Sequence, residues 1–310
     1  MTKVRASRHA SDTVHTLSPV EHVSVTRHAT ADAFLDHVAD FLAAREAEHN
    51  LILGLSSRLR RDPRVYGEDP HFAVAEAGGE VVAVTMRTPP HNLILSLVDD
   101  EAAIAPLAED ALEAFGSLPG VVGPKEPVAR FAERWQELTA AAARLELAQR
   151  TFKAEHVEPP ANVRGRLRDY ERADRELAAC WMDAFAEEAL PEPPPESSEE
   201  FVDRREQDPD GGLVLWEDDG RAVCMAGYGG RTPNGIRIGP VYTPPELRGR
   251  GYASALTAAV TQRLLDSGLR FCFLFTDLAN PTSNSIYQRI GYRAVADVDL
   301  WTFSGRSAER

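Results

Sequence analysis

Hydrophobic positions between residues 20 and 154 follow two periods. Alternation at every second residue over 21–28 (EHVSVTRH) predicts a strand, and apolar residues spaced three and four apart over 34–42 predict a helix. A second helix is expected over about 49–61, then a hairpin in which Gly78-Gly79 joins two apolar runs. The remaining elements expected in this half are a strand at 92–98, a helix at 101–115, a strand at 120–124, a helix at 127–140 and a strand at 145–154.

The same order of elements recurs after the proline-containing segment 155–165 (EHVEPPANVRG), which predicts a boundary. The next helix places Leu177, Trp181 and Phe185 on one face at a spacing of four residues. A second hairpin turns at Asp219-Gly220. The other elements expected here are a strand at 165–171, a short helix near 198–207, a strand at 236–243, a helix at 252–266, a strand at 271–278, a helix at 281–290 and a strand at 292–303.

Both halves therefore follow the order β-α-α-β-β-β-α-β-α-β. This pattern predicts an α/β (α+β) protein of two domains, each with a mixed, mostly antiparallel sheet flanked by helices. We place the domains at 20–157 and 158–310, after a disordered tail at 1–19. A tandem repeat is the favoured interpretation of the similarity, and chance agreement between two α/β patterns is the alternative.

Composition narrows the possible functions. The 310 residues are 43% hydrophobic and 26% charged, as in soluble globular proteins, and the formal net charge is −14. That charge argues against general binding to nucleic acid or to an anionic membrane. Cys180, Cys224 and Cys272 lie far apart, which indicates no disulfide scaffold and no zinc site. With no apolar run of membrane-spanning length and no secretory signal, a cytoplasmic location is expected.

The stretch 245–256 (PELRGRGYASAL) combines arginines and glycines at the start of an expected helix. The first N–H groups of a helix lack partners inside it and, with the helix dipole, form an anion site. Gly249 and Gly251 allow backbone approach and positive φ, while Arg248 and Arg250 add charge suited to phosphate oxygens. The pattern predicts a phosphate-binding loop.

Three known patterns of phosphate-binding loop are candidates for this stretch. A Walker loop requires Gly-Lys-Ser/Thr, and no lysine is present here. A dinucleotide fingerprint requires Gly or Ala where Ser254 stands, and an acidic residue about 20 positions later, which is missing. The third pattern, Gln/Arg-x-x-Gly-x-Gly/Ala, is met by Arg248, Gly251 and Ala253.

In this loop, and in 275–292 (FTDLANPTSNSIYQRIGY), the second half resembles the GNAT family of acyl-CoA-dependent N-acyltransferases. The resemblance implies that the backbone of Val241, Tyr242 and Thr243 pairs with the pantetheine arm of acetyl-CoA. It also implies that Asn280 lies near the thioester and Tyr287 faces the sulfur. The remaining cofactor-binding residues it implies are those that would hold the pyrophosphate: Arg248, Gly249, Arg250, Gly251, Tyr252, Ala253 and Ser254.

Family members also part the strand before the loop from its neighbour, often at a bulge. Gly239-Pro240 is consistent with this because proline cannot donate to a strand ladder. Asn280-Pro281 predicts a helix N-cap, and Gly291 its end. Tyr287 keeps its proton at neutral pH and is the expected general acid; the alternative is a packing tyrosine.

The general base is left open. All nine histidines lie at or before His156, so the second half supplies none. Asp277, Tyr228, a carboxylate from 187–206, a chain of waters, or no base at all remain as alternatives. The segment 187–211 carries ten acidic residues against two arginines. It would attract a cationic amine if it borders the acceptor pocket, and would otherwise be a solvated loop.

The first half lacks the loop motif: after 92–98 comes an acidic, glycine-free sequence, DDEAAIAPLAED. It is expected to be a degenerate GNAT-like domain that does not bind coenzyme A. Its segment 86–92 could form a wall of the acceptor pocket and contains His91, for which the alternative is an ordinary loop histidine. The function implied is transfer of acetyl from acetyl-CoA to a primary amine of a small molecule, without a metal and in a ternary complex. The alternative is a non-catalytic acyl-CoA sensor.

Overall fold

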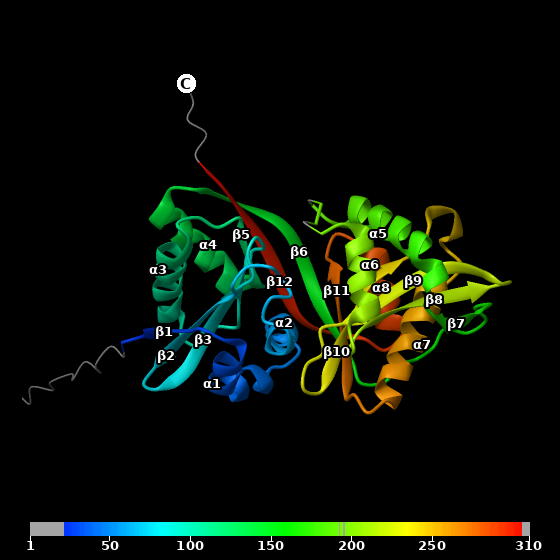
Figure 1. The fold of residues 1–310 in the computed structure, drawn as a ribbon, viewed down its shortest axis with the longest axis horizontal. Helices are drawn as coiled ribbons and strands as arrows, with labels where there is room; N and C mark the ends of the chain where they lie inside the picture. The colour runs from blue at the N-terminus through cyan, green and yellow to red at the C-terminus, as the bar shows by residue number, and fades with distance from the viewer. Residues whose placement is uncertain (1–21, 192, 195, 306–310) are drawn as a thin grey trace, which may run out of the picture.

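The computed structural model describes residues 22–191, 193–194 and 196–305, so the expected tail at 1–19 lies outside the described residues. Figure 1 shows two α/β halves joined by long strands. The elements of the first half are β1 (Ser24–His28), α1 (Ala31–Ala44), α2 (Asn50–Arg61), β2 (His71–Ala77), β3 (Glu80–Arg87), β4 (Leu93–Leu95), a 3-10 turn (Glu101–Ala103), α3 (Ile104–Phe115), β5 (Gly120–Pro124), α4 (Lys125–Thr139) and β6 (Ala142–Ala154).

The second half repeats this order. Its elements are β7 (Arg166–Asp169), a 3-10 turn (Arg172–Asp174), α5 (Arg175–Ala189), α6 (Ser198–Gln207), β8 (Gly212–Asp218), β9 (Arg221–Gly229), β10 (Gly235–Tyr242), a 3-10 turn (Pro245–Leu247), α7 (Tyr252–Asp266), β11 (Phe271–Asp277), α8 (Pro281–Arg289) and β12 (Arg293–Ser304). The predicted order of elements is confirmed in both halves. No helix in the described part of the chain combines the length and the hydropathy needed to cross a membrane.

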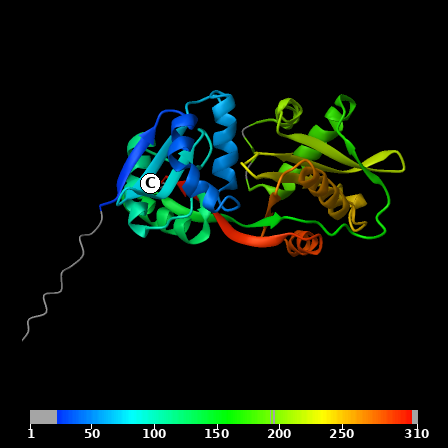
Figure 2. The same ribbon diagram turned by 90° about the horizontal axis from the view of Figure 1, so that it is seen from below.

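The two sheets are continuous and share their central strands. The strand order is β1-β2-β3-β4-β5-β12-β6-β11-β10-β9-β8-β7. The last strand of each half therefore lies next to β5 or β11 of the other half, because β12 pairs with β5 and β6 pairs with β11. In Figures 1 and 2, β12 runs as a red ribbon from one half into the other. Each half thus completes its sheet with a strand from its counterpart.

Helices cover both faces of each half. In the first half, α1 and α2 pack on one face around Phe34 and Phe72, and α3 and α4 on the other around Phe131 and Trp135. In the second half, α5 and α6 pack on one face, and α7 and α8 pack on the other. The domain limits at 157 and 158 stay an interpretation of chain order, since β6 and β12 belong to the sheets of both halves.

Two details differ from the expected elements. Of the expected stripe on α5, Trp181 is buried and Phe185 packs against the same core, but Leu177 is 36% exposed, so the prediction is wrong at Leu177; small residues and Met182 complete the buried face. Small side chains bring α5 close to the sheet and turn the bulky Leu177 outward. The strand expected at 92–98 ends at Leu95. Beyond it, Ser96 bonds to Val84 through both its N–H and its hydroxyl, in place of a regular ladder.

A buried carboxylate joins the two halves where α2 approaches the β9–β10 turn. Glu46 is 6% exposed and accepts hydrogen bonds from the Asn234 N–H and Nδ2, both at 2.8 Å, and from the Thr232 hydroxyl. Close by, a Cβ on Gly54 would lie 2.8 Å from the Gly230 carbonyl oxygen, so α2 touches this turn directly. The contact fixes the first half over the α5/α6 face of the second.

We expect Glu46→Ala to lower the free energy of unfolding by about 2–3 kcal/mol, because it leaves buried donors of Thr232 and Asn234 without an acceptor. Urea denaturation followed by circular dichroism measures this. Glu48→Ala, two residues away on a half-buried glutamate, is the matched control and should change stability by less than about 0.5 kcal/mol. Equal effects of the two substitutions would contradict the role given to Glu46.

Candidate active site

The strands β10 and β11 pair only at their beginnings and then part. Their parallel register covers Gly235 with Phe271, Ile236 with Cys272 and Arg237 with Phe273, and no later pair follows. On its other side β10 continues to pair with β9, at Val241 and Tyr242. The edge of β10 that faces β11 is therefore open from residue 238 onward. Unpaired backbone N–H and C=O groups at such an edge can bind an extended ligand as a strand would.

The parting coincides with an irregularity at Gly239-Pro240. The register of β10 against β9 shifts between Ile238 and Val241, which is the bulge expected from the sequence. Pro240 has no N–H to donate, and Gly239 has φ 147°, a conformation that side-chain-bearing residues rarely adopt. A Cβ on Gly227 of β9 would lie 2.9 Å from the Gly239 carbonyl oxygen, so the bulge is packed tightly against β9.

The open edge leads directly to the N-terminus of α7. No side chain caps this helix, and its first bond runs from the Ala255 N–H to the Gly251 carbonyl. The N–H groups of residues 252–254 thus lack helical acceptors and carry the positive end of the dipole. Gly249 and Gly251 adopt φ of 77° and 84°. The arrangement is that of an anion-binding loop, with backbone amides as its donors.

The two arginines of the loop point in different directions. Arg248 donates from Nε to the Thr243 carbonyl at 2.8 Å and pairs with Glu188 of α5 at 2.7 Å. Its side chain thus ties the loop to α5, on the side of β10 that carries Tyr242. Arg250 is exposed and has only a long 3.5 Å contact to the Glu246 carbonyl. Of the two predicted phosphate ligands, Arg250 has the guanidinium group that is free of a carboxylate among the described residues.

Other predicted ligands have structural partners of their own. The Tyr252 hydroxyl donates to Asp218 at 2.6 Å, and its ring is buried. The Tyr242 ring is also buried and contacts Trp181, so only its backbone faces the opening. The Asn280 side chain accepts from the Ser283 N–H at 3.0 Å, which confirms the predicted N-cap of α8. Ala253 and Ser254 contribute N–H groups at the first turn of α7.

Tyr287 lies beside the end of β10, among buried groups. It packs against the α7 core, 6.0 Å from the ring of Tyr292, and lies close enough to Cys224 for that thiol to affect its pKa. Cys224 in turn accepts a hydrogen bond from the Thr243 hydroxyl at 3.2 Å. Burial raises the pKa of Tyr287 above its ordinary value of 10, and raises the pKa of Cys224 to about 12. Tyr287 therefore keeps its proton, and Cys224 stays a thiol.

The structure narrows the candidates for a general base without selecting one. The Asp277 carboxylate accepts the Ala279 N–H at 2.8 Å and serves a turn. Tyr228 follows Cys224 by four residues along β9, so the two residues lie about 13 Å apart along the strand. The Tyr228 ring packs against the guanidinium group of Arg263 of α7. His91 keeps more than a third of its surface exposed, but partial desolvation of its ring lowers its pKa below 6.5. From the second half, the charge of Glu196 raises this pKa and that of Arg204 lowers it.

The acidic segment 187–211 is largely neutralised by arginines. Its ion pairs include Glu188 with Arg248, Glu196 with Arg204, Asp203 with Arg175, and Glu206 with Arg172. Glu200 instead completes a capping box with Ser197 at the start of α6. The segment is therefore part of the α5–α6 structure. Among the described residues of this segment, few carboxylates remain unpaired, so little negative charge is left to attract a cationic amine.

The corresponding place in the first half is closed. A Cβ on Gly123 of β5 would lie 2.5 Å from the Leu95 carbonyl oxygen, so β4 and β5 remain in contact where β10 and β11 part. The Asp100 carboxylate accepts the Ala102 N–H at 2.9 Å, where an anion would otherwise bind. Both features support the expectation that this half does not bind coenzyme A.

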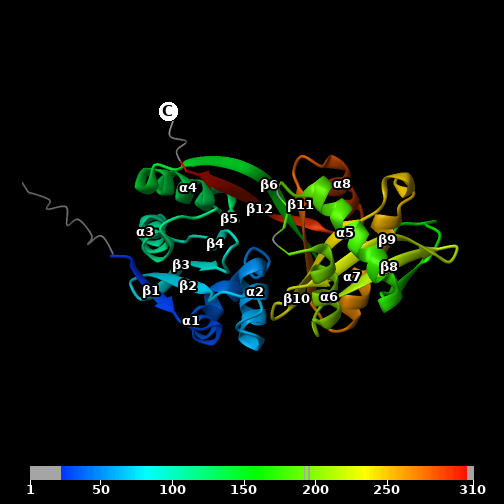
Figure 3. The same cartoon turned by 45° about the horizontal axis from the view of Figure 1, so that its top comes forward.

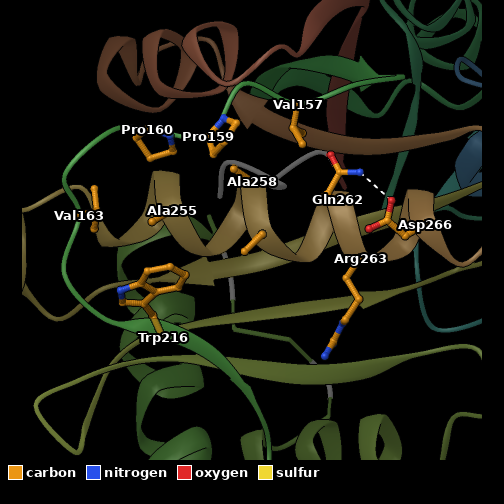
Figure 4. Close-up of a pocket in the computed structure, with 11 residues that line it drawn as sticks. Val157, Pro159, Pro160, Val163, Trp216, Ala255, Ala258, Gln262, Arg263 and Asp266 are labelled. Atoms are coloured by element: carbon orange, nitrogen blue, oxygen red, sulfur yellow. Dashed lines mark hydrogen bonds between the residues drawn. The ribbon is translucent and has the colours of Figure 1, made fainter.

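A separate cavity of about 440 Å³ lies between α7 and the segment 157–163 (Figure 4). Most of its wall is apolar, and Pro159, Val163 and Trp216 are among the residues that line it. At its polar end Gln262 donates to Asp266 at 2.7 Å, as the dashed line shows, and Arg263 is paired with Asp169. Arg263 thus has an ion pair outside the cavity, while Asp266 has the neutral amide of Gln262 as its partner. The described residues contain no group of three or more potential metal ligands, here or elsewhere.

Comparison with known proteins agrees with this geometry. Residues 179–292 match the family model described as Acetyltransferase (GNAT) family. This part of the chain is a GNAT domain. The GNAT domain thus runs from α5 to the start of β12 and contains both the parted strands and the loop at α7.

Relatives of this GNAT domain extend over different lengths. Mycothiol acetyltransferase from Arthrobacter sp. (strain FB24) is 37% identical over 101 residues, which is 29% of this chain and only 30% of that protein. A GCN5-related N-acetyltransferase from Sphaerobacter thermophilus has a TM-score of 0.58 at 18% identity, over 90% of this chain and 95% of its own. A tandem GNAT protein from the clavulanic acid biosynthesis pathway has a TM-score of 0.58 at 14% identity, over 92% and 100%. The two structures show a shared fold.

The sequence predicted the loop and Tyr287 as site residues, but it did not predict the side chains on the sheet face opposite to Tyr287. Arg237 is the single charged residue in the strand 236–243, and this is the sequence signal that marks it. Arg205 lies within an acidic segment and looks solvated in sequence, yet it is 7% exposed. Glu46 has no local pattern that marks it, because its partners are 186 and 188 positions away.

We expect Gly251→Ala to weaken the binding of acetyl-CoA by more than about tenfold, because a Cβ would meet Val163 at 2.9 Å and φ of 84° is strained for alanine. Isothermal titration calorimetry measures the affinity. Gly268→Ala carries similar strain, φ 100°, in open space at the other end of α7 and should leave the affinity unchanged. Unaltered binding by Gly251→Ala would remove the loop from the proposed site.

Proposed function

We propose that this protein transfers acetyl from acetyl-CoA to a primary amine of a small molecule, with both substrates bound together at the parted strands β10 and β11. The observation that carries the proposal is the open edge of β10 leading into an uncapped helix N-terminus. An extended pantetheine arm fits the first, and a pyrophosphate fits the second. The match of residues 179–292 to the GNAT family supports the same activity.

The residues present fit this co-substrate. Backbone of Val241, Tyr242 and Thr243 would pair with the pantetheine amides, and the N–H groups of 249–254 with Arg250 would hold the pyrophosphate. The loop glycines leave no Cβ where the ligand approaches, and among the described residues no side chain caps the N-terminus of α7. By contrast, Asp100 fills the equivalent place in the first half. One site per chain is therefore proposed.

Acetyl-CoA would supply an activated acetyl thioester at the bulge. The amine nitrogen forms a bond to the acetyl carbon, the carbon–sulfur bond breaks, and the amine releases a proton to solvent or to an unassigned base. Tyr287 donates its phenolic proton to the departing sulfur. Burial raises the pKa of Cys224 to about 12. The same surroundings would make the thiolate that leaves from acetyl-CoA strongly basic, and a strongly basic thiolate accepts the proton readily.

A non-catalytic sensor of acyl-CoA is the alternative. The same open edge and loop would bind the ligand, and the first half would report it through the shared strands β6 and β12. Such a module has no need for a protonated tyrosine at the sulfur. The enzyme is favoured because Tyr287 lies with Cys224 and Thr243 at the end of β10, in surroundings that keep its proton in place.

Thiol release provides the test of the activity. We expect at least one class among amino acids, amino sugars, polyamines and arylamines to release free coenzyme A thiol from acetyl-CoA in the presence of the protein. The product should show a mass increase of one acetyl group by mass spectrometry. Flat traces with every amine, together with intact binding of acetyl-CoA, would favour the sensor.

We expect Tyr287→Phe to lower kcat by about 100-fold or more while the dissociation constant of acetyl-CoA stays within twofold. Tyr292→Phe is a matched control, because it removes the hydroxyl that bonds to Thr261 at 2.7 Å in the core. That variant should lose stability but keep kcat. Equal kcat in wild type and Tyr287→Phe would exclude the acid role.

The pH dependence gives an independent test. The acid must be protonated, and burial raises the pKa of Tyr287, so its proton stays on above pH 10. We therefore expect kcat to show no fall between pH 8 and 10, where an unshifted tyrosine of pKa 10 would already lose half of its activity. A fall of kcat with a midpoint at or below pH 10, absent from Tyr287→Phe, would contradict the raised pKa.

A further inference from the structure

An arginine lies on the face of the sheet opposite to Tyr287, at the inner end of the opening. Ile236 and Ile238 belong to the α7 core, so Arg237 between them points to the other face. Its guanidinium carbon lies 6.0 Å from the ring centre of Phe275, on the strand across the opening. Arg237 also belongs to the last backbone pair before β10 and β11 part. It therefore stands where an acceptor would reach the thioester from the α5/α6 side.

A second, buried guanidinium lies next to it. Arg205 of α6 is 7% exposed; its Nη1 donates to the Tyr228 carbonyl at 2.8 Å, while its Nε has no partner among the described residues. A Cβ on Gly229 would overlap this guanidinium, so the glycine makes room for it. Gly229 is the register partner of Arg237 on β10. Burial is the main cause, and the charge of Arg237 the next, of a pKa of Arg205 that is lowered to about 9.

Nearby carboxylates are matched by other arginines. Glu196 accepts from Arg204 through both oxygens, at 2.7 to 3.1 Å. Asp208, whose charge also acts on Arg205, lies 3.9 Å from Arg58 and 3.7 Å from Arg61. Within the described residues, no carboxylate lies within ion-pair distance of Arg205, and Arg237 has neither a hydrogen bond nor an ion pair. Two positively charged side chains on this face thus lack a carboxylate partner among the described residues.

The first half closes over these charges. Helix α2 contacts β10, as Figure 3 shows, and the Tyr66 ring that follows it lies close enough to Arg237 to affect its pKa. Arg205 is itself 7% exposed, and removal from water strengthens the attraction of an anion to a guanidinium.

We propose that Arg237, supported by Arg205, binds an oxyanion group, a carboxylate or a phosphate, carried by the same small molecule that bears the acceptor amine. A guanidinium presents paired donors that match both groups. The inference rests on the proposed function and names the substrate class: an anionic amine in place of the cationic amine that the acidic segment suggested. It also gives the first half a role, as the second wall of the acceptor site.

Side-chain NMR of arginine tests the oxyanion site without any turnover. In the full chain labelled with ¹⁵N-arginine and saturated with coenzyme A, titration with acetate or inorganic phosphate should shift an Nε–Hε signal that disappears in Arg237→Gln. The shift should saturate, and the stronger of the two anions identifies the group. Arg221→Gln, which removes an exposed arginine at the β8–β9 turn, is the matched control and should keep the shift. No saturable shift with either anion, or its persistence in Arg237→Gln, overturns the proposal.

Matched acceptors then test the substrate class. In wild type, kcat/KM for glycine over glycinamide, or for glucosamine 6-phosphate over glucosamine, should favour the anionic member by about 10- to 100-fold. Arg237→Gln should bring that ratio near one, and Arg237→Lys should restore part of it, with the KM of acetyl-CoA unchanged. A ratio near one in wild type overturns the assignment of the anion to the acceptor. If the NMR shift is present but no amine releases thiol, acetyl transfer fails and the oxyanion site stands.

Discussion

The structure of the candidate site depends on the separation of β10 from β11 after residue 237. Two neighbouring parallel strands normally exchange hydrogen bonds along their length, and an open edge inside a sheet leaves polar groups without partners. Here the cause lies in the chain itself: Pro240 cannot donate and Gly239 holds a φ of 147°, so the register against β9 shifts. The helix after the strand then begins without a cap. A ligand with amide groups and phosphates satisfies both deficits at once.

The closed counterpart in the first half shows that the fold alone does not create this opening. Both halves have the same order of elements, yet β4 and β5 stay in contact at Leu95 and Gly123. Asp100 occupies the start of the following helical turn. The exchange of β6 and β12 joins the two halves, and Glu46 holds the first half over the second. The first half is thus held against the second by shared strands and by a buried carboxylate.

Local patterns in the sequence were sufficient to predict every helix and strand in order, because each depends on the spacing of its own apolar residues and on its own caps. They were also sufficient for the loop at 248–254 and the N-cap at Asn280. They could not predict the exchange of β6 and β12, since either strand alternates equally well beside either neighbour. Leu177 was misplaced because helical spacing alone does not tell which stripe carries the small residues that approach a sheet.

Charge was the least predictable feature, because it depends on which groups meet in three dimensions. The segment 187–211 has an excess of acidic residues, but in the structure Glu188, Glu196 and Asp203 each have an arginine partner. Arg237 and Arg205 have no carboxylate partner among the described residues, although the chain as a whole carries a net charge of −14. The unpaired charges on the sheet face that carries Arg237 are thus opposite in sign to the net charge. If the acceptor binds on this face, as we propose, these local positive charges would select it, and the net charge of the chain would not.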